Sequence, residues 1–310
     1  MEIPAVIIHT YAVMKNEKSI GYIARAALIA ATVIWGSSFI IVKDVTATLP
    51  ASTLLAIRFL SAAVILGLVF LPKNSKIDVG YIWRGGILGV LLYTAYTLQT
   101  LGIADTTPGK NAFLTAVYCV MVPFFAWGIS KKRPDRYNLI AAFVCITGIG
   151  LVSLNDDLTI RGGDLLTLAG GVFFALHIIA VSRFSDGRDS VPLTVFQFAS
   201  SGICALIVAL IFERGGVTGE ISGELVLGVA YLAVCCTAVA LFFQNFGQKY
   251  TEPSTASLLL SLESVFGVIF SAAMGREELN AKIIAGFVLI FAAVVISETK
   301  LSFLFKRKTE

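Results

Sequence analysis

The stretch LQTLGIADTTP at residues 98–108 returns as FQNFGQKYTEP at residues 243–253, and this repetition decides the fold. Glutamine, glycine and proline fall at the same places in both copies, at a constant offset. The likeness resumes farther on, where IAAFV at residues 140–144 meets IAGFV at residues 284–288 after a slip of one residue. Chance likeness between apolar segments would not keep these residues in register, so the pattern indicates an internal duplication.

A looser match joins the earlier parts of the two copies. The segment from Trp35 to Lys43 aligns with the segment from Phe174 to Arg183, and RFLS at residues 58–61 aligns with QFAS at residues 197–200. The duplication therefore divides the chain into two repeats of five helices each, flanked by an N-terminal tail to which we assign no function and by a short basic tail. The N-terminal tail is predicted at residues 1–21 and the basic tail at residues 304–310. The two repeats are predicted at residues 22–154 and 155–303.

The composition indicates that lipid surrounds this chain. Hydrophobic residues make up 57% of it and charged residues 14%, against roughly 25% charged residues in soluble domains. Apolar runs long enough to cross about 30 Å of hydrocarbon as helices occur ten times. They lack the alternation of membrane barrel strands. We therefore predict an all-α membrane protein with ten transmembrane helices, near residues 22–42, 51–71, 81–103, 108–130, 137–154, 163–182, 191–212, 224–247, 253–274 and 281–303.

Parity and charge predict the orientation of these helices. Five crossings per repeat are an odd number, so the second repeat must begin on the opposite side of the membrane, which gives inverted-topology repeats. With the N-terminus in the cytoplasm, most of the 24 Lys and Arg residues fall in loops on the inner side, as the positive-inside rule requires. We predict a multi-pass protein of the cell membrane with both termini cytoplasmic.

Several classes of function lack support in the sequence. The formal charge of +4 is spread over short loops, which argues against a nucleic-acid partner. Gly109-Lys110-Asn111 does not complete a P-loop, so ATP-driven transport by this chain alone is not expected. The cysteine spacing matches neither a zinc site nor a disulfide framework, and paired carboxylates or a nucleophile with its base are missing. We expect no metal, no cofactor and no catalytic residue.

The chain resembles the drug/metabolite transporter superfamily, in particular its EamA-type ten-helix members. The likeness covers most of the chain and rests on IWGSSF at residues 34–39, Arg58-Phe59, the stretch from Leu98 to Ala112, and LESVF at residues 262–266. This resemblance implies a basket of helices around a central cavity. The first, third, fourth, sixth, eighth and ninth helices would line the cavity, and the fifth and tenth would brace the periphery.

Glu263 is predicted near the middle of the membrane, in the ninth helix. A charge within lipid is costly, so each ionisable residue there asks for a reason. The carboxyl could take up and release a proton and thereby couple protons to solute movement, or it could be a hydrogen-bonded packing residue. Tyr118 holds the equivalent position in the first repeat, so we expect the two to face each other across the pseudo-twofold axis. Members of the resembled family commonly carry proline after this glutamate; Ser264 stands there instead and gives no such cause for a kink.

Two further ionisable residues fall inside predicted helices. Arg58 could attract anionic groups, or pair with Glu263 or with carbonyl groups at helix ends. Because the resemblance places Arg-Phe there whatever the solute, we favour a structural or gating role for it. His177 could titrate near neutral pH, although a lone histidine on an apolar helix is more often a packing residue.

Gln99 and Gln244 are equivalent residues near the ends of their helices, on opposite sides of the membrane. This placement suits a pair of gates better than a central site, with hydrogen bonding between helices as the alternative. The remaining candidates for an amphipathic solute-binding surface are aromatic or polar residues of the first repeat, namely Trp35, Ser38, Tyr96 and Asn111.

Pro108 and Pro253 have a local explanation. Each can occupy the first turn of its helix, where a missing N–H costs nothing. Thr107 and Glu252 precede them as candidate caps. We assign both prolines a structural or gating role.

These features predict a secondary transporter that exports small metabolites, amino acids or drug-like compounds by alternating access. The alternatives are a nutrient uptake carrier of the same fold and, less favoured, an intramembrane enzyme. The expected partners are a small-molecule solute, the lipid bilayer and protons as a source of driving force.

Overall fold

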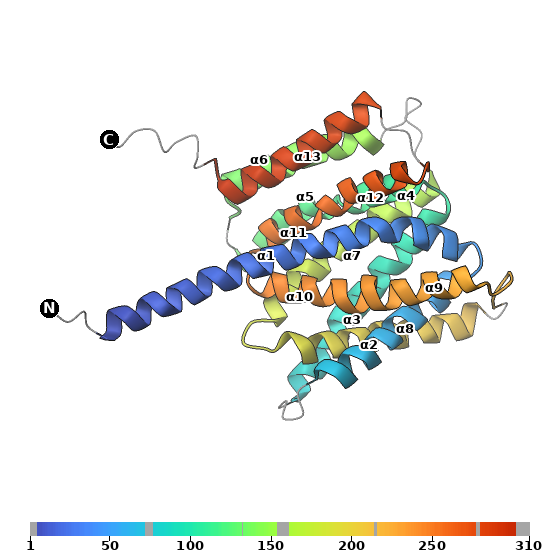
Figure 1. The fold of residues 1–310 in the computed structure, drawn as a ribbon, viewed down its shortest axis with the longest axis horizontal. Coiled ribbons are helices and arrows are strands. Elements are labelled where there is room, and N and C mark those ends of the chain that lie inside the picture. Colours follow the sequence, from blue (N-terminus) through green and yellow to red (C-terminus); the bar gives the residue numbers. More distant parts are fainter. Residues whose placement is uncertain are drawn as a thin grey trace.

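The computed structural model describes residues 5–71, 77–131, 133–153, 161–213, 216–276 and 280–301. Nearly all of these residues are helical (Figure 1). The elements of the first repeat are α1 (Ala5–Thr46), α2 (Ala51–Phe70), α3 (Val79–Ala104), α4 (Pro108–Thr115), α5 (Tyr118–Ser130) and α6 (Arg136–Ser153). Those of the second repeat are α7 (Gly162–Phe184), α8 (Ser190–Phe212), α9 (Gly223–Tyr231), the π-helix η1 (Leu232–Val239), α10 (Ala240–Lys249), α11 (Pro253–Leu260), α12 (Leu262–Ala273) and α13 (Ala281–Thr299).

These elements combine into ten rods within the described ranges, because α4 with α5, α9 with η1 and α10, and α11 with α12 each form one interrupted helix. Eight rods are long and apolar enough to cross a membrane, and α13 contains a shorter apolar run at Ile284–Ala293. The prediction of an all-α fold with ten transmembrane helices is therefore confirmed.

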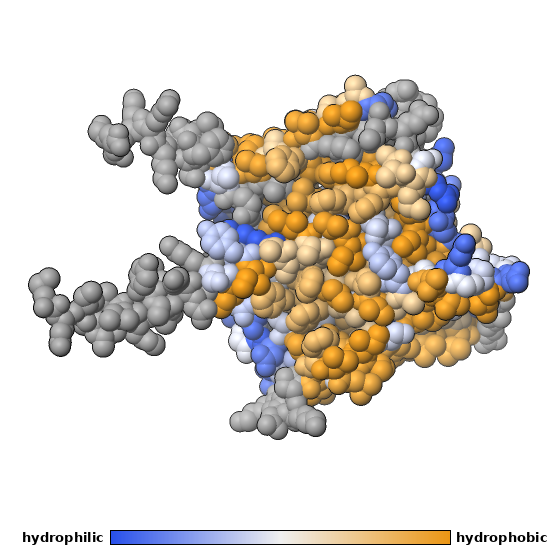
Figure 2. Space-filling view, in the orientation of Figure 1, coloured by the Kyte–Doolittle hydropathy of each residue, from blue (hydrophilic) through white to orange (hydrophobic). Residues whose placement is uncertain are grey.

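The hydropathy of the bundle surface changes along the direction of the rods. Apolar side chains cover its middle in a broad band, and hydrophilic side chains gather at the two ends (Figure 2). The start of α1 and the end of α13 lie at the same end of the bundle (Figure 1). α1 is already helical from Ala5, so residues 5–21, where the sequence predicts a tail, are part of this helix. The predicted basic tail at residues 304–310 lies outside the described residues.

The core of the bundle is formed by contacts between the two repeats. α2 packs against α8, α3 against α7 and α8, and α1 against α10 and α12. α6 and α13 pack against each other at one edge (Figure 1), which confirms the peripheral place that the resemblance implies for the fifth and tenth helices. The crossing of α1 and α12 is tight: a Cβ atom on Gly36 would lie 2.4 Å from Cβ of Phe266 and 2.8 Å from its carbonyl carbon.

Replacing Gly36 with alanine is expected to destabilise the protein by about 1–3 kcal/mol, because the new methyl group would push against the backbone of α12. The measurement is thermal unfolding of the purified variant in detergent. Gly21→Ala is the matched control, since a Cβ there would meet nothing within 4 Å. Equal melting temperatures for Gly36→Ala and the wild type would show that this crossing is looser than described.

The fourth and ninth rods are interrupted at equivalent points. α4 and α11 have 8 residues each, begin at the paired prolines, and end before Ala116 and Ser261 respectively. Tightened hydrogen bonds follow, from Cys119 N to Ala116 O at 3.0 Å and from Ser264 N to Ser261 O at 3.1 Å. The hydroxyl groups of Ser261 and Ser264 also donate to carbonyls three residues earlier, at 2.7 Å each, a pattern that bends helices. The interruption therefore forms without the family's proline.

The third rods of the two repeats differ in one respect. α3 has 26 residues, whereas the rod from Gly223 to Lys249 has 27. Both begin with a side-chain cap, Asp78 accepting from Tyr81 N and Ser222 from Leu225 N. A π-helix accommodates an extra residue within an otherwise α-helical rod, so η1 absorbs the added residue while α3 stays α-helical.

Candidate functional site

A cavity lies where the two repeats meet, with about 390 Å³ of space including its opening. Its walls come from α1, α3, α5, α7, α10, α11 and α12. These are the rods that the resemblance implies, so the expected lining is confirmed. Seven of the candidate residues line the cavity, namely Trp35, Ser38, Tyr96, Gln99, Tyr118, Gln244 and Glu263.

Glu263 and Tyr118 form the polar centre of this cavity. Tyr118 begins α5 and Glu263 is the second residue of α12, so each follows the interruption of its rod. The Tyr118 hydroxyl donates to Oε1 of Glu263 at 3.0 Å, and Glu263 is 6% exposed. The expectation that the two residues face each other is confirmed. In the described part of the chain, Glu263 has no ion-pair partner.

Aromatic rings form much of the remaining wall. The ring of Phe174 stands edge-on to that of Tyr96, with centroids 5.2 Å apart, and lies 6.3 Å from that of Tyr118. The indole of Trp35 donates to the carbonyl of Cys236 in η1 at 2.8 Å, which ties the cavity wall to the π-helix. Sequence reasoning did not select Phe174, although its alignment with Trp35 was a usable signal. It also missed the apolar lining residues Phe39, Ile178 and Leu260.

Arg58 is buried next to the central cavity but is not one of its lining residues. Its side chain is 1% exposed, and its Nε donates to Oγ1 of Thr237 in η1 at 3.0 Å. The guanidinium group lies 5.1 Å from the centre of the Tyr96 ring. The ion pairs of the described residues do not join Arg58 to Glu263. Its contacts thus connect α2, η1 and a residue of the cavity wall.

The two glutamines occupy one site. Gln99 and Gln244 both line the central cavity, so the expectation that they stand at two separate gates is not what the structure gives. Gln99 Nε2 donates to Oγ1 of Thr115 at 3.0 Å, and Gln244 Nε2 donates to Oε1 of Gln248 at 3.3 Å. Each lies five residues before the last residue of its rod, Ala104 or Lys249, and its side chain still lines the cavity.

The paired prolines stand at the first position of α4 and α11. Oγ1 of Thr107 accepts from Lys110 N at 3.2 Å, which confirms Thr107 as a helix cap. Glu252 makes no side-chain cap in front of Pro253, so that prediction was wrong. Its longer side chain does not form the short return hydrogen bond that Ser, Thr, Asp and Asn make at this position.

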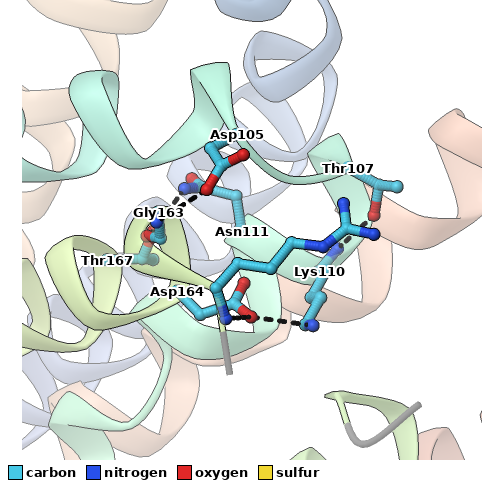
Figure 3. Close-up of polar contacts among 8 residues, drawn as sticks. Asp105, Thr107, Lys110, Asn111, Gly163, Asp164 and Thr167 are labelled. Carbon is cyan, nitrogen blue, oxygen red and sulfur yellow. Dashed lines mark hydrogen bonds and ion pairs between the residues drawn. The ribbon is translucent and has the colours of Figure 1, made fainter. Parts of the chain in front are cut away.

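Asn111 lies outside the cavity, in a polar network at the end of the bundle where α3 meets α7 (Figure 3). Its Nδ2 donates to Oγ1 of Thr167 at 2.8 Å. Lys110 pairs with Asp164 at 2.9 Å, and the carboxylate of Asp105 accepts from Gly163 N at 3.1 Å. These contacts join the α3–α4 connection to the first turn of α7.

Lys43 closes the same end from α1. Its Nζ donates to the carbonyls of Ile103, Ala104 and Thr106, at 2.8, 2.7 and 3.1 Å. Such donors satisfy the orphan carbonyls at a helix C-terminus. We call this end, with Lys43, the Lys110–Asp164 pair and their hydrogen bonds, the sealed end.

At the opposite end, where α10 ends and α11 begins, Lys249 Nζ donates to the carbonyl of Arg188 at 2.7 Å. A second cavity there has about 1000 Å³ of space including its mouth, and its lining includes Ser182, Arg183 and Pro253. Nearby, Arg188 and Asp78 form an ion pair between two connections, and the hydrogen bond from Arg188 lowers the pKa of Asp78. His177 lines neither cavity; it is fully buried on α7.

Comparisons with known proteins agree with this architecture. A sequence profile described as the EamA-like transporter family matches residues 23–154 and 161–299, one match in each repeat. A transporter of Archaeoglobus fulgidus is 31% identical over 274 residues, covering 88% of this chain and 85% of the relative. The inner membrane transporter YedA of Escherichia coli is 22% identical, covering 89% of this chain and 91% of the relative.

A solved crystal structure of another protein shares the fold. It superposes with a TM-score of 0.74 at 15% identity and covers 91% of this chain and 98% of that chain. The paired matches of the family profile and the paired interruptions of α4–α5 and α11–α12 describe the same duplication.

Proposed function

The chain belongs to the EamA-like transporter family and is a multi-pass membrane transporter, and from this premise we propose that it exports a small amphipathic solute in exchange for protons. Membership of this family identifies the chain as a transporter, so we do not pursue the alternative of an intramembrane enzyme. The solute, the direction and the use of protons are the proposed part.

The observation that carries the proposal is the Tyr118–Glu263 hydrogen bond at the interruption of two equivalent rods. Carriers built from inverted repeats place solute and coupling-ion sites near the midplane, at discontinuous helices from both halves. A buried carboxyl with a neutral partner can hold a proton or release it without breaking an ion pair. Protonation of this carboxyl on the outer side and release of the proton on the inner side, alternating with the movement of the solute, would couple the two movements.

The cavity lining favours a neutral or cationic solute. Glu263 is its acidic residue, and Lys or Arg is absent from the lining residues in the described ranges. Aromatic faces of Tyr96, Tyr118 and Phe174 offer apolar contact and can hold a cation. The amides of Gln99 and Gln244 can orient polar groups of the solute. Amino acids, amines and drug-like compounds meet this description better than anions do.

The proposed direction combines charge with the difference between the two ends. The positive-inside rule places the start of α1 and the end of α13 in the cytoplasm. The sealed end is then the outer end. The cavity with Arg183, of about 1000 Å³ including its mouth, opens toward the cytoplasm, and a smaller one of about 630 Å³, beside Asp44 and Ser222, lies at the outer end. This arrangement suits loading from the cytoplasm and favours export over uptake.

Flux into or out of proteoliposomes tests the proposal. A thermal-shift screen of amines, amino acids and drug-like compounds first selects a solute, because a ligand that prefers the native state raises its stability. The selected solute is then expected to move against its gradient when the opposite compartment is acidic. Transport that ignores the pH gradient would remove proton exchange, and failure to transport any compound of the panel would count against the proposed solute class.

A further inference from the structure

A second buried group of polar side chains lies between α7, α8 and α10, outside the central cavity. Its members are His177 on α7, Thr194 and Gln197 on α8, and Asn245 and Gln248 on α10, each at most 1% exposed. We call these five residues the inner polar cluster.

The hydrogen bonds of the inner polar cluster leave both donors and acceptors unpaired. The Thr194 hydroxyl donates to the Ser190 carbonyl at 2.7 Å, so its oxygen is the acceptor for Asn245 Nδ2 at 2.9 Å. The same Nδ2 also donates to Oε1 of Gln197 at 3.0 Å. Asn245 Oδ1, an acceptor, and Gln197 Nε2, a donor, are left without partners.

Three more polar atoms of the cluster are unpaired, namely Gln248 Nε2 and both ring nitrogens of His177. Gln197 lies beside the imidazole, but no hydrogen bond of regular geometry joins the two. The cluster thus holds five of the eleven buried side-chain polar atoms that lack a hydrogen bond among the described residues. Buried polar atoms are nearly always paired, and lipid offers them no partner.

Helix packing does not require polar side chains at two of these positions. The repeat aligns Thr194 with Leu55 and Gln248 with Ile103, and both of these apolar residues are buried. Gln197 and Asn245 instead align with Arg58 and Thr100, which are also polar and buried. Since the first repeat packs apolar residues at the positions of Thr194 and Gln248, these two residues of the second repeat indicate a role other than packing.

We infer that the inner polar cluster binds water, and that this water joins the central cavity to the end of the bundle where α10 ends. The cluster has no charged member, which argues against an ion, while its mixture of open donors and acceptors suits water. Gln244 provides the connection, because it lines the central cavity with Glu263 and donates to Gln248 at 3.3 Å.

The inference that the cluster binds water depends on its unpaired polar atoms and not on the proposed function. The further step, that this water conducts protons between Glu263 and the cytoplasm, rests on the proposed function. Arranged in this way, the second repeat would supply a wet path on one side of Glu263, whereas the first repeat has apolar Leu55 and Ile103 in place of Thr194 and Gln248.

Hydroxyl-radical labelling tests this inference. Radicals produced by X-ray radiolysis of water react with adjacent side chains, including buried ones, and mass spectrometry locates the products. His177 is expected to be labelled in the purified wild-type protein although it is 0% exposed. Phe198 is the matched control, because it is also 0% exposed and follows Gln197 on α8. Labelling of His177 as slow as that of Phe198 would overturn the inference.

A double variant identifies the side chains that hold the water. Thr194→Leu with Gln248→Ile copies the residues of the first repeat, and His177 labelling is expected to fall several-fold toward the Phe198 level. Unchanged labelling would overturn the assignment to this cluster. If the double variant does not fold, the wild-type comparison of His177 with Phe198 decides. Labelling needs no transported solute, so labelled His177 in a protein without transport would keep the water site and remove only the proposed function.

Discussion

A Glu263→Gln variant is expected to bind its solute but to lose the accumulation that a pH gradient drives. With one proton exchanged per solute, one pH unit supports about a tenfold concentration ratio, because one pH unit and one tenfold concentration step are each about 1.4 kcal/mol. Glutamine keeps the size of the side chain and an oxygen that can accept from Tyr118, but it cannot exchange a proton. The ratio in proteoliposomes should therefore fall to about one, with downhill movement of the solute retained.

Tyr118→Phe is the matched control for this experiment. It removes the hydroxyl that donates to Glu263 and leaves the carboxyl in place, so uphill transport should persist at a changed rate. Accumulation by Glu263→Gln equal to that of the wild type would show that another group carries the proton. Loss of solute binding in the same variant would place the carboxyl in recognition instead.

Opening of the sealed end is expected when Lys43 is replaced by methionine. The substitution keeps a long apolar stem but removes three hydrogen bonds to carbonyls at the end of α3 and just beyond it. A single hydrogen bond from a charged group contributes about 1.5–3 kcal/mol. Its loss alone would raise the population open at that end by about tenfold or more. A thiol introduced by Ser38→Cys, in the central cavity, reports this opening to an impermeant maleimide added outside right-side-out vesicles.

The control for Lys43 is Arg276→Met. Arg276 lies at the same end and pairs with Asp44, but both side chains are about half exposed, and exposed ion pairs contribute little. Labelling of the introduced thiol should rise with Lys43→Met and stay near the wild-type rate with Arg276→Met. Peptide mapping separates it from the five native cysteines. Equal rates for both variants would mean that Lys43 does not hold this end shut.

The sequence is informative about the fold because lipid and duplication leave few alternatives. Ten apolar runs specify ten rods, and matched Gln, Gly and Pro residues specify the pairing of Gln99 with Gln244 and of Tyr118 with Glu263. That pairing also led to the correct contact between Tyr118 and Glu263, since equivalent residues of inverted halves approach each other near their axis. Seven of the candidate residues gather in one cavity for the same reason.

The errors concern how far a side chain reaches from its rod. Sequence position puts Gln99 and Gln244 near opposite ends, yet both line the cavity. Asn111 and His177 were candidates for solute binding but lie outside the cavity. Asn111 donates to Thr167 on α7, and His177 is buried beside Gln197 on α8. Periodicity along one helix does not specify which neighbour a polar side chain meets. The π-helix was likewise invisible, because one extra residue in an apolar run changes no pattern.

That extra residue has an energetic consequence for the cycle of a carrier. Two identical halves could trade conformations at no net cost, and the molecule would then spend equal time facing each side of the membrane. Among the described residues, the wide turn of η1 belongs to the second half alone, and both Trp35 and Arg58 are anchored to it. If this transporter works by alternating access, we expect its two facing states to be unequal in free energy and the empty protein to rest on one side.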